Sequence, residues 1–209
     1  MLEIGLVAFT TLFATIGAVD VAAIFAALSK DFSPADRRRT ALRGCLVAAG
    51  ILTVLALVGE ALLQEMGITL AALRTAGGIL LLLMGIDMVF ARHSGAISTT
   101  SDERAEASKK PDISVFPLAT PLLAGPGAMG AVILLMADAR GEPLAQVMVV
   151  VALLANIAVA FVLLLTAGQL SRILGVTGLN VITRVVGVLL SALAVQFVFD
   201  GIAGSGLLD

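Results

Sequence analysis

The stretch Ala119-Thr120-Pro121-Leu122-Leu123-Ala124-Gly125-Pro126-Gly127 decides the fold. Its last seven residues hold two prolines and two glycines, inside an apolar segment that runs from about Val115 to Met136. Proline removes a backbone donor and clashes with the preceding turn, while glycine makes a break cheap. In hydrocarbon, the freed backbone groups must face protein or a water-filled cavity. Because transporters present such breaks to their substrates, we predict a substrate-facing break here; a kinked helix used only for packing is the alternative.

The composition indicates an integral membrane protein. Hydrophobic residues make up 59% of the 209 residues and charged residues 13%, and the mean hydropathy is +1.09, values far from those of soluble proteins. A net charge of −2 gives no reason to expect a nucleic-acid partner. Cys45 and His93 are the only cysteine and histidine, so we expect no metal site of the usual kind and no cofactor. Cys45 is expected to pack as a small hydrophobe.

The lengths of the apolar segments predict an all-α integral membrane protein, because about twenty apolar residues cross a bilayer as a helix. Six transmembrane helices are expected, at residues 4–28, 36–63, 69–91, 114–137, 144–169 and 181–205. Ser33, Pro34 and Asp36 have the pattern of a capped start for the second helix. Short loops are expected at residues 138–143 and 175–180. The N-terminus has no basic n-region, so the first span is expected to stay in the mature protein.

The basic residues predict the orientation in the membrane. Eleven of the thirteen lie in or beside the loops that follow spans one, three and five: Lys30, Arg37, Arg38, Arg39, Arg43, Arg92, Arg104, Lys109, Lys110, Arg172 and Arg184. Cytoplasmic loops carry an excess of Lys and Arg. The polar linker at residues 92–112 is therefore expected to be cytoplasmic, and both termini are expected to face outward.

The linker divides the chain into a three-helix repeat at residues 1–91 and a second at residues 113–209. Arg74-x-x-Gly77 in the third span reappears as Arg184-x-x-Gly187 in the sixth, and Gly17–Asp20 occupies an offset in the first span close to that of Gly125-Pro126-Gly127 in the fourth. An odd number of spans per repeat inverts the second copy. The pattern thus predicts two inverted three-helix repeats with broken helices one and four; coincidence is the alternative, because Arg-x-x-Gly is short.

At this point the chain resembles the MarC family of six-span bacterial inner-membrane proteins. The resemblance is carried by Phe116–Ala128, Leu73–Gly78, the helix start from Ser33 to Arg39, and Val195-Gln196-Phe197 followed by Gly201-Ile202. It implies a secondary transporter or exporter of small neutral amino acids, such as glycine, alanine, serine and threonine, in the inner membrane. The family usually has Asn-Pro-Ile-Gly or Asp-Pro-Ile-Gly in the first span. Here these positions read Gly17-Ala18-Val19-Asp20, so the first break is weakened.

An amino acid zwitterion needs partners for both of its charged ends. Its carboxylate suits a helix N-terminus, which the residues after Gly125-Pro126-Gly127 can provide. Its ammonium suits Asp20, which is also the candidate site of a coupling proton or sodium ion because charges at depth usually mark pathways. A buried side chain that only locks helices together is the alternative. The candidate substrate-binding residues are Gly17, Asp20, Thr120, Gly125, Pro126, Gly127, Gln196, Thr15 and Asn156, of which the uncharged polar ones have an alternative role in interhelical hydrogen bonding.

Other functions remain open from the sequence. An intramembrane aspartyl hydrolase using Asp20 and Asp87 is disfavoured because the two lie at different depths and the Gly-x-Gly-Asp motif is missing, so we do not expect an enzyme. A channel or transporter for another small solute, or a scaffold that transports nothing, is the alternative to amino acid transport. Small-residue faces such as Gly77-Gly78 suit close helix packing and permit a homo-oligomer without requiring one. For Arg74 the sequence leaves two roles open, an ion pair with Glu60 or Glu65 and a contact with the substrate.

Overall fold

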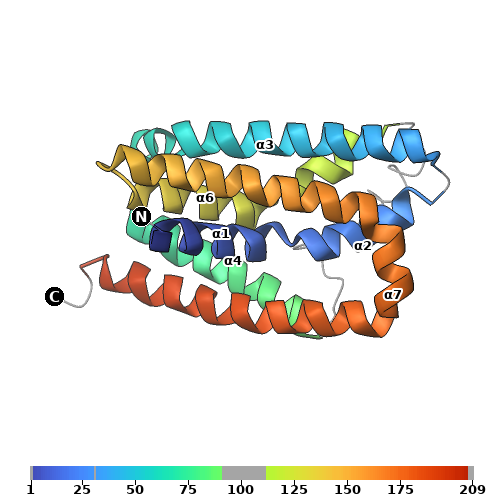
Figure 1. Ribbon diagram of the computed structural model, residues 1–209. Helices are drawn as coiled ribbons and strands as arrows, with labels where there is room; N and C mark the ends of the chain where they lie inside the picture. Colours follow the sequence, from blue (N-terminus) through green and yellow to red (C-terminus); the bar gives the residue numbers. More distant parts are fainter. Residues whose placement is uncertain (1, 31, 91–111, 207–209) are drawn as a thin grey trace.

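The computed structural model describes residues 2–30, 32–90 and 112–206, and within these ranges the chain contains helices and no strand. The elements lie side by side in one bundle (Figure 1), which confirms the predicted all-α class. They are α1 (Leu2–Ile16), α2 (Ala18–Leu28), α3 (Pro34–Glu65), α4 (Leu70–Phe90), the π-helical segment η1 (Ser114–Leu123), α6 (Pro126–Asp138) and α7 (Pro143–Ala203).

The apolar helices agree with six membrane spans. Five stretches are long and apolar enough to cross a membrane: Glu3–Leu28, Pro34–Glu65, Leu70–Phe90, Pro143–Ala167 and Asn180–Ala203. A sixth is formed by η1 and α6 together, which meet at a bend of 58°. The predicted boundaries therefore hold to within a few residues, apart from the junction of the last two spans.

The loop predicted at residues 175–180 is wrong. α7 runs as one helix of 61 residues from Pro143 to Ala203, turns a corner, and runs back toward the other end of the bundle (Figure 1). The chain from 168 to 179 contains glycines but no proline. Glycine only makes a helix break cheaper, whereas proline removes a backbone donor and forces one. The two spans are thus joined by a bent helix.

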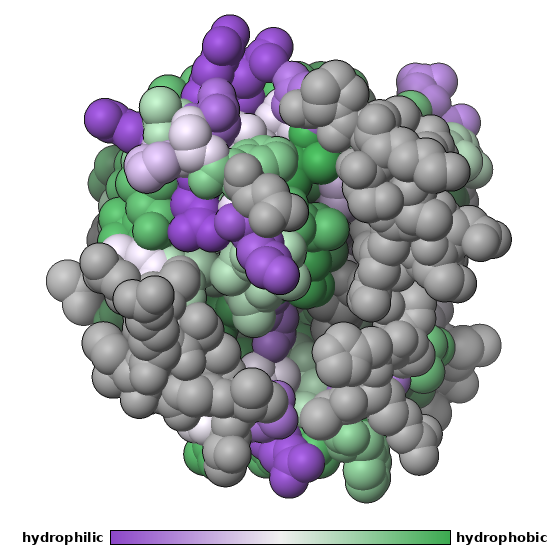
Figure 2. Space-filling view, turned by 90° about the vertical axis from the view of Figure 1, so that its right-hand side faces the viewer, coloured by the Kyte–Doolittle hydropathy of each residue, from purple (hydrophilic) through white to green (hydrophobic). Residues whose placement is uncertain are grey.

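Both ends of the described chain lie at one end of the bundle, together with the turn between α3 and α4 (Figure 1). The α2–α3 connection and the corner of α7 lie at the opposite end. Hydrophilic side chains gather on that second end (Figure 2), and the exposed basic residues there include Lys30, Arg38, Arg39 and Arg43. The connections after spans one and five therefore lie at the end of the bundle opposite to the termini, as the predicted orientation requires. The assignment of this end to the cytoplasm stays a prediction.

The start of α3 is capped as predicted. Pro34 is the first helical residue, and the backbone N–H of Asp36 donates to Ser33 Oγ at 3.1 Å. Ser33 Oγ in turn donates to Asp36 Oδ2 at 2.6 Å. The pair satisfies one of the N–H groups that every helix start leaves open.

Replacing Ser33 is expected to lower stability in a way that depends on capping. Ser33→Ala removes the acceptor and should cost about 1 kcal/mol, which corresponds to a fall of about 2–4 °C in Tm for a chain of this size. Ser33→Asp keeps an acceptor at the same place and should unfold close to the wild-type temperature. Thermal unfolding in detergent, followed by circular dichroism, checks both variants; equal losses in the two would contradict a capping role.

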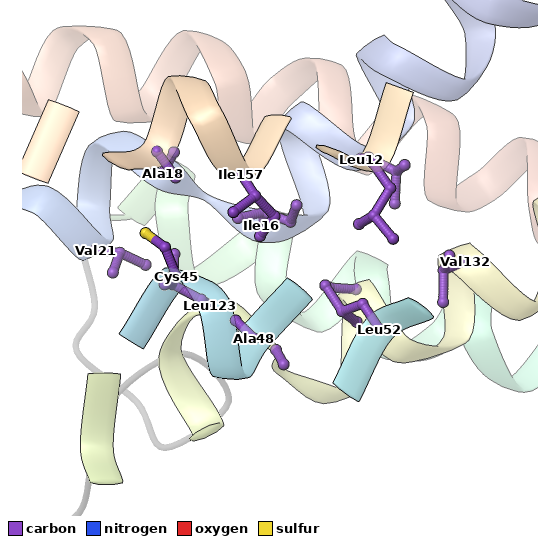
Figure 3. Close-up of a cluster of buried hydrophobic side chains, with 14 of the residues drawn as sticks. Leu12, Ile16, Ala18, Val21, Cys45, Ala48, Leu52, Leu123, Val132 and Ile157 are labelled. Carbon is purple, nitrogen blue, oxygen red and sulfur yellow. The ribbon is translucent and has the colours of Figure 1, made fainter. Parts of the chain in front are cut away.

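One apolar core joins the first, second and fourth spans to the first half of α7. α1 packs against α6, and α2 packs against η1. Leu12, Ile16, Val21 and Leu123 are buried in this core (Figure 3). Cys45 is 3% exposed and lies in the same cluster, which confirms its expected role as a small hydrophobe.

A seam of glycines joins α4 to the second half of α7. We call Gly78 and Gly85 of α4 with Gly187 and Gly201 of α7 the glycine seam. A Cβ on Gly78 would lie 2.7 Å from the carbonyl oxygen of Ala194, and one on Gly187 would lie 2.7 Å from Met88 Cβ. The backbones therefore touch where side chains are absent, as small residues allow in membranes. The packing role predicted for Gly78 is confirmed.

Candidate functional site

The first span is broken at Gly17. This residue has φ 59° and ψ 41°, the left-handed conformation that favours glycine. The helix resumes at once, since the Val21 N–H donates to the Gly17 carbonyl oxygen at 3.0 Å. The first span is therefore broken as predicted, although Ala18 stands where the family's proline would be. A glycine in the left-handed conformation supplies the break.

The fourth span is broken between η1 and α6. Phe116 and Thr120 have extended backbones, and each precedes a cis-proline. The Ala124 N–H donates to the Ala119 carbonyl oxygen at 2.8 Å, one residue beyond α-helical spacing. α6 then begins at Pro126, and no side chain within the described residues caps it at Gly125. The predicted break is confirmed, and it leaves the N-terminus of α6 facing the bend.

The two breaks lie at the same level of the bundle. The half of span one before its break packs against the half of span four after its break, and the remaining halves pack against each other, because α1 contacts α6 and α2 contacts η1. The flanking residues Ile16, Ala18, Ala124 and Ala128 belong to one buried cluster. The structure thus brings the Gly17 and Gly125 regions together, as a paired site requires.

Asp20 lies in the first turn of α2 and reaches across to α7. Thr183 Oγ1 donates to Asp20 Oδ1 at 2.6 Å. A carboxylate in this position is favoured by the positive end of the α2 dipole. Beside it is a cavity of about 10 Å³, lined by Phe13, Gly17, Met88 and Val186 in addition to the Asp20–Thr183 pair. This volume is close to that of a single water.

Two methionines of α4 connect Asp20 to the N-terminus of α6. A Cβ on Gly127 would lie 2.7 Å from Met84 Sδ, and Met88 lines the cavity at Asp20. One helical turn separates the two methionines, about 6 Å along α4. The uncapped start of α6 and the carboxylate therefore approach α4 at adjacent turns. This group of Asp20, Thr183, Gly127, Met84 and Met88 is the candidate site.

Four other predicted residues are not part of this group: Thr15, Thr120, Pro126 and Gln196. Thr15 is buried, and its hydroxyl donates to the Leu12 carbonyl oxygen at 3.3 Å. Thr120 is half-buried in η1, and Pro126 is exposed. Gln196 is exposed and donates to Asp200 Oδ1 at 2.7 Å. α7 rises about 20 Å between Thr183 and Gln196, so the structure does not bring Gln196 to the breaks.

Asn156 is 2% exposed and ties α7 to α1. Its amide nitrogen donates to the carbonyl oxygens of Phe9 at 3.1 Å and Ala152 at 2.9 Å. Its amide oxygen is buried without a hydrogen-bond partner among the described residues. Phe9 precedes Gly17 by about 12 Å along α1. Asn156 is therefore a polar point in the core beside the first half of span one, away from the break.

The ion pair with Glu60 or Glu65 that the sequence suggests for Arg74 is wrong. Its guanidinium bonds Asp138 at the end of α6, while Glu60 pairs with Arg140 at 2.5 Å. The end of α6 brings Asp138 to Arg74 of α4, and the turn that follows brings Arg140 to Glu60 of α3. The spacing of these residues in the sequence does not reveal this arrangement. Both ion pairs join the first half of the chain to the second.

Sequence reasoning missed Thr183, Met84 and Met88. Each is a single polar or flexible residue in an apolar span, and methionine is a common gap-filler in cores. No periodicity or motif distinguishes them. Only the packing of α4 against α6 and α7 places them at the breaks.

Comparisons with known proteins agree with this architecture. The family model described as MarC family integral membrane protein matches residues 2–205. The UPF0056 membrane protein MJ1677 of Methanocaldococcus jannaschii is 34% identical over 206 residues, covering 98% of each chain. The UPF0056 membrane protein YhcE of Escherichia coli is 35% identical over 204 residues, covering 96% of this chain and 94% of its own.

A third relative, the UPF0056 membrane protein YvbG of Bacillus subtilis, is 34% identical over 197 residues, covering 94% of this chain and 92% of its own. No solved structure shows a significant match. A match of this extent, on a bundle with paired helix breaks, shows that the chain belongs to the MarC family of integral membrane proteins.

Proposed function

We propose that this protein is a secondary transporter or exporter of small neutral amino acids, of the glycine, alanine, serine and threonine class, in the bacterial inner membrane. One observation carries the proposal: the breaks at Gly17 and Gly125 lie within one buried core, where α1 packs against α6 and α2 against η1, with a carboxylate at one break and an uncapped helix start at the other. Paired broken helices at this depth are how many secondary transporters bind their substrates.

The two breaks offer complementary chemistry to a zwitterion. The N-terminus of α6 presents backbone N–H groups and a positive dipole end, which suit a carboxylate. Asp20 suits the ammonium group. The cavity beside Asp20 has room for about one water, so an amino acid enters only after α4 or α7 moves away from the breaks. Such a change is expected of a protein that opens to each side of the membrane in turn.

The hydrogen bond between Asp20 and Thr183 supports ion coupling. It joins α2 of the first half to α7 of the second half. A proton or a sodium ion on the Asp20 carboxylate would alter this bond, and so would bias the packing of one half against the other. We propose Asp20 as the coupling site on this ground, and we propose no enzymatic activity.

The test is counterflow in proteoliposomes. Protein is reconstituted with unlabelled glycine, alanine, serine or threonine inside, and uptake of the same labelled amino acid is followed with and without a proton or sodium gradient. Saturable exchange of at least one of the four is the expected result. Flat traces for all four, in protein shown to be folded, would leave a transporter or channel for another solute, or a scaffold.

Gly127→Ala is expected to lower counterflow roughly tenfold or more, because small misplacements at a binding site are costly. The new methyl group meets the flexible end of Met84, so the chain should still fold while the start of α6 is obstructed. Gly130→Ala is the matched control, since a Cβ there meets no atom within 4 Å. Equal transport by the two variants would remove the start of α6 from the site.

A further inference from the structure

A second hollow of this protein lies away from the helix breaks. Its volume is about 360 Å³, and it lies where the end of α3 turns into the start of α4. Its polar lining comprises Glu60, Gln64, Thr69 and Arg140. Arg140 belongs to the turn after α6, so both halves of the chain contribute. We call this hollow the end pocket. The turn between α3 and α4 that lines it lies at the same end of the bundle as the two termini (Figure 1).

The end pocket holds one fixed negative group and one adjustable positive group. Arg140 Nη1 donates to Glu60 Oε1 at 2.5 Å, and Gln64 Nε2 donates to the same oxygen at 3.1 Å. The Glu60 side chain is 20% exposed, whereas that of Arg140 is 64% exposed. The carboxylate is therefore largely buried and held by two hydrogen bonds to one oxygen. The guanidinium, with five donors in a planar fork, is free to turn toward a second anion.

Local sequence builds this arrangement. A Cβ on Gly59 would lie 3.0 Å from Ile133 Cδ1, so the absence of a side chain lets α6 approach the end of α3 next to Glu60. Gly67 has φ 69°, the left-handed conformation that turns the chain sharply after α3. Thr69 Oγ1 accepts from the Ala72 N–H at 3.1 Å and so caps the start of α4. The close approach of α6 at Gly59, the turn at Gly67 and the helix cap at Thr69 together form the pocket.

We propose that the end pocket binds a zwitterionic group, with its ammonium against Glu60 and its anionic oxygens against Arg140. An isolated anion that drew the Arg140 guanidinium away would leave Glu60 with only its hydrogen bond from Gln64, which is unfavourable for a partly buried carboxylate. A group that carries both charges a few bonds apart replaces the ion pair by two new ones. Arginine is well suited to the anionic end because it binds carboxylates and phosphates through two parallel bonds.

Two sources offer this chemistry. One is a free amino acid, for which the end pocket would be a first capture site; this source rests on the proposed transport function. The other is the headgroup of an ethanolamine phospholipid, which joins a primary ammonium to a phosphate. The ends of membrane helices lie at the depth of lipid headgroups, and Leu63, Ile68 and Leu70 give the pocket an apolar wall. This second source is independent of transport.

Two binding measurements on full-length protein separate the sources. In nanodiscs of phosphatidylcholine, equilibrium binding of labelled glycine and serine is measured. In nanodiscs of mixed phosphatidylethanolamine and phosphatidylglycerol, the lipids that stay bound are measured by native mass spectrometry. Both use wild-type protein, Glu60→Gln and Arg140→Gln. Arg43→Gln is the matched control, because Arg43 forms an exposed ion pair with Asp112 at the opposite end of the bundle.

The expected result is a loss of at least fivefold in one of the two measurements for both pocket variants, with Arg43→Gln equal to wild type. Loss of bound phosphatidylethanolamine assigns the pocket to lipid, and loss of amino acid binding assigns it to the solute. Amino acid binding that disappears in Asp20→Asn but not in Glu60→Gln belongs to the helix breaks. The proposal is overturned if the pocket variants match wild type or Arg43→Gln in both measurements, whatever counterflow shows.

Discussion

Gly187→Leu is expected to leave little folded protein, because it places a branched side chain inside the glycine seam. A Cβ at this position would already lie 2.7 Å from Met88 Cβ and 3.0 Å from the Gly85 carbonyl oxygen. Two of the three nearest atoms belong to the backbone of α4, which cannot turn aside as a side chain can. The cost should exceed the roughly 1–3 kcal/mol that is typical of added methylenes in a packed core.

Gly50→Leu is the matched control for this prediction. Gly50 is an exposed glycine within α3, and a Cβ there meets no atom within 4 Å. It also faces outward from the bundle, where leucine is favourable in hydrocarbon. Size-exclusion chromatography of fluorescent fusions should show a single symmetrical peak for Gly50→Leu and aggregate for Gly187→Leu. Similar profiles for the two would mean that α4 and α7 do not pack as the structure has them.

Asp20→Asn is expected to abolish the response of transport to an ion gradient. Asparagine keeps the size of the side chain and an oxygen for Thr183, but it cannot take up a proton and holds no negative charge. Gradient-driven uptake should fall roughly tenfold or more, a factor within the range to which typical coupling free energies correspond. Counterflow without a gradient should persist at a reduced level. The measurement is uptake in proteoliposomes across a range of pH, with and without sodium.

Two variants of Thr183 accompany this prediction. Thr183→Val removes the donor that reaches Asp20 Oδ1 and should weaken coupling, whereas Thr183→Ser keeps the hydroxyl and should restore most of it. Uptake by Asp20→Asn that matches wild type at every pH would exclude Asp20 from coupling. In that case the bond to Thr183 serves only to hold α2 against α7.

The elements that could be predicted from sequence are those set by local chemistry. Ser33-Pro34 starts α3 because capping and proline geometry act within one turn. The proline–glycine run breaks the fourth span for the same kind of reason. The corner of α7 was missed because glycines permit a break without forcing one, and the surrounding packing decides.

The candidate site was only partly predictable because it depends on contacts between distant segments. The sequence shows Asp20 as a charge at depth, and the structure adds its partner Thr183, which no local pattern marks. Gln196 is a candidate from sequence because it is a polar residue in a span, yet it is exposed and donates to Asp200. The inverted internal repeat stays a prediction, although both copies hold a broken span followed by two more.

The bent helix α7 limits where this protein can change shape. Its hydrogen-bonded backbone continues from Pro143 to Ala203. Spans five and six are therefore joined by continuous helix and form one bent unit, which we call the α7 frame, without a hinge between them. Span four is jointed at Ala124–Gly125 and span one at Gly17. A rocking motion between the halves would therefore pivot on these two joints against the α7 frame, and the residues best placed to meet a substrate would be the hinges themselves.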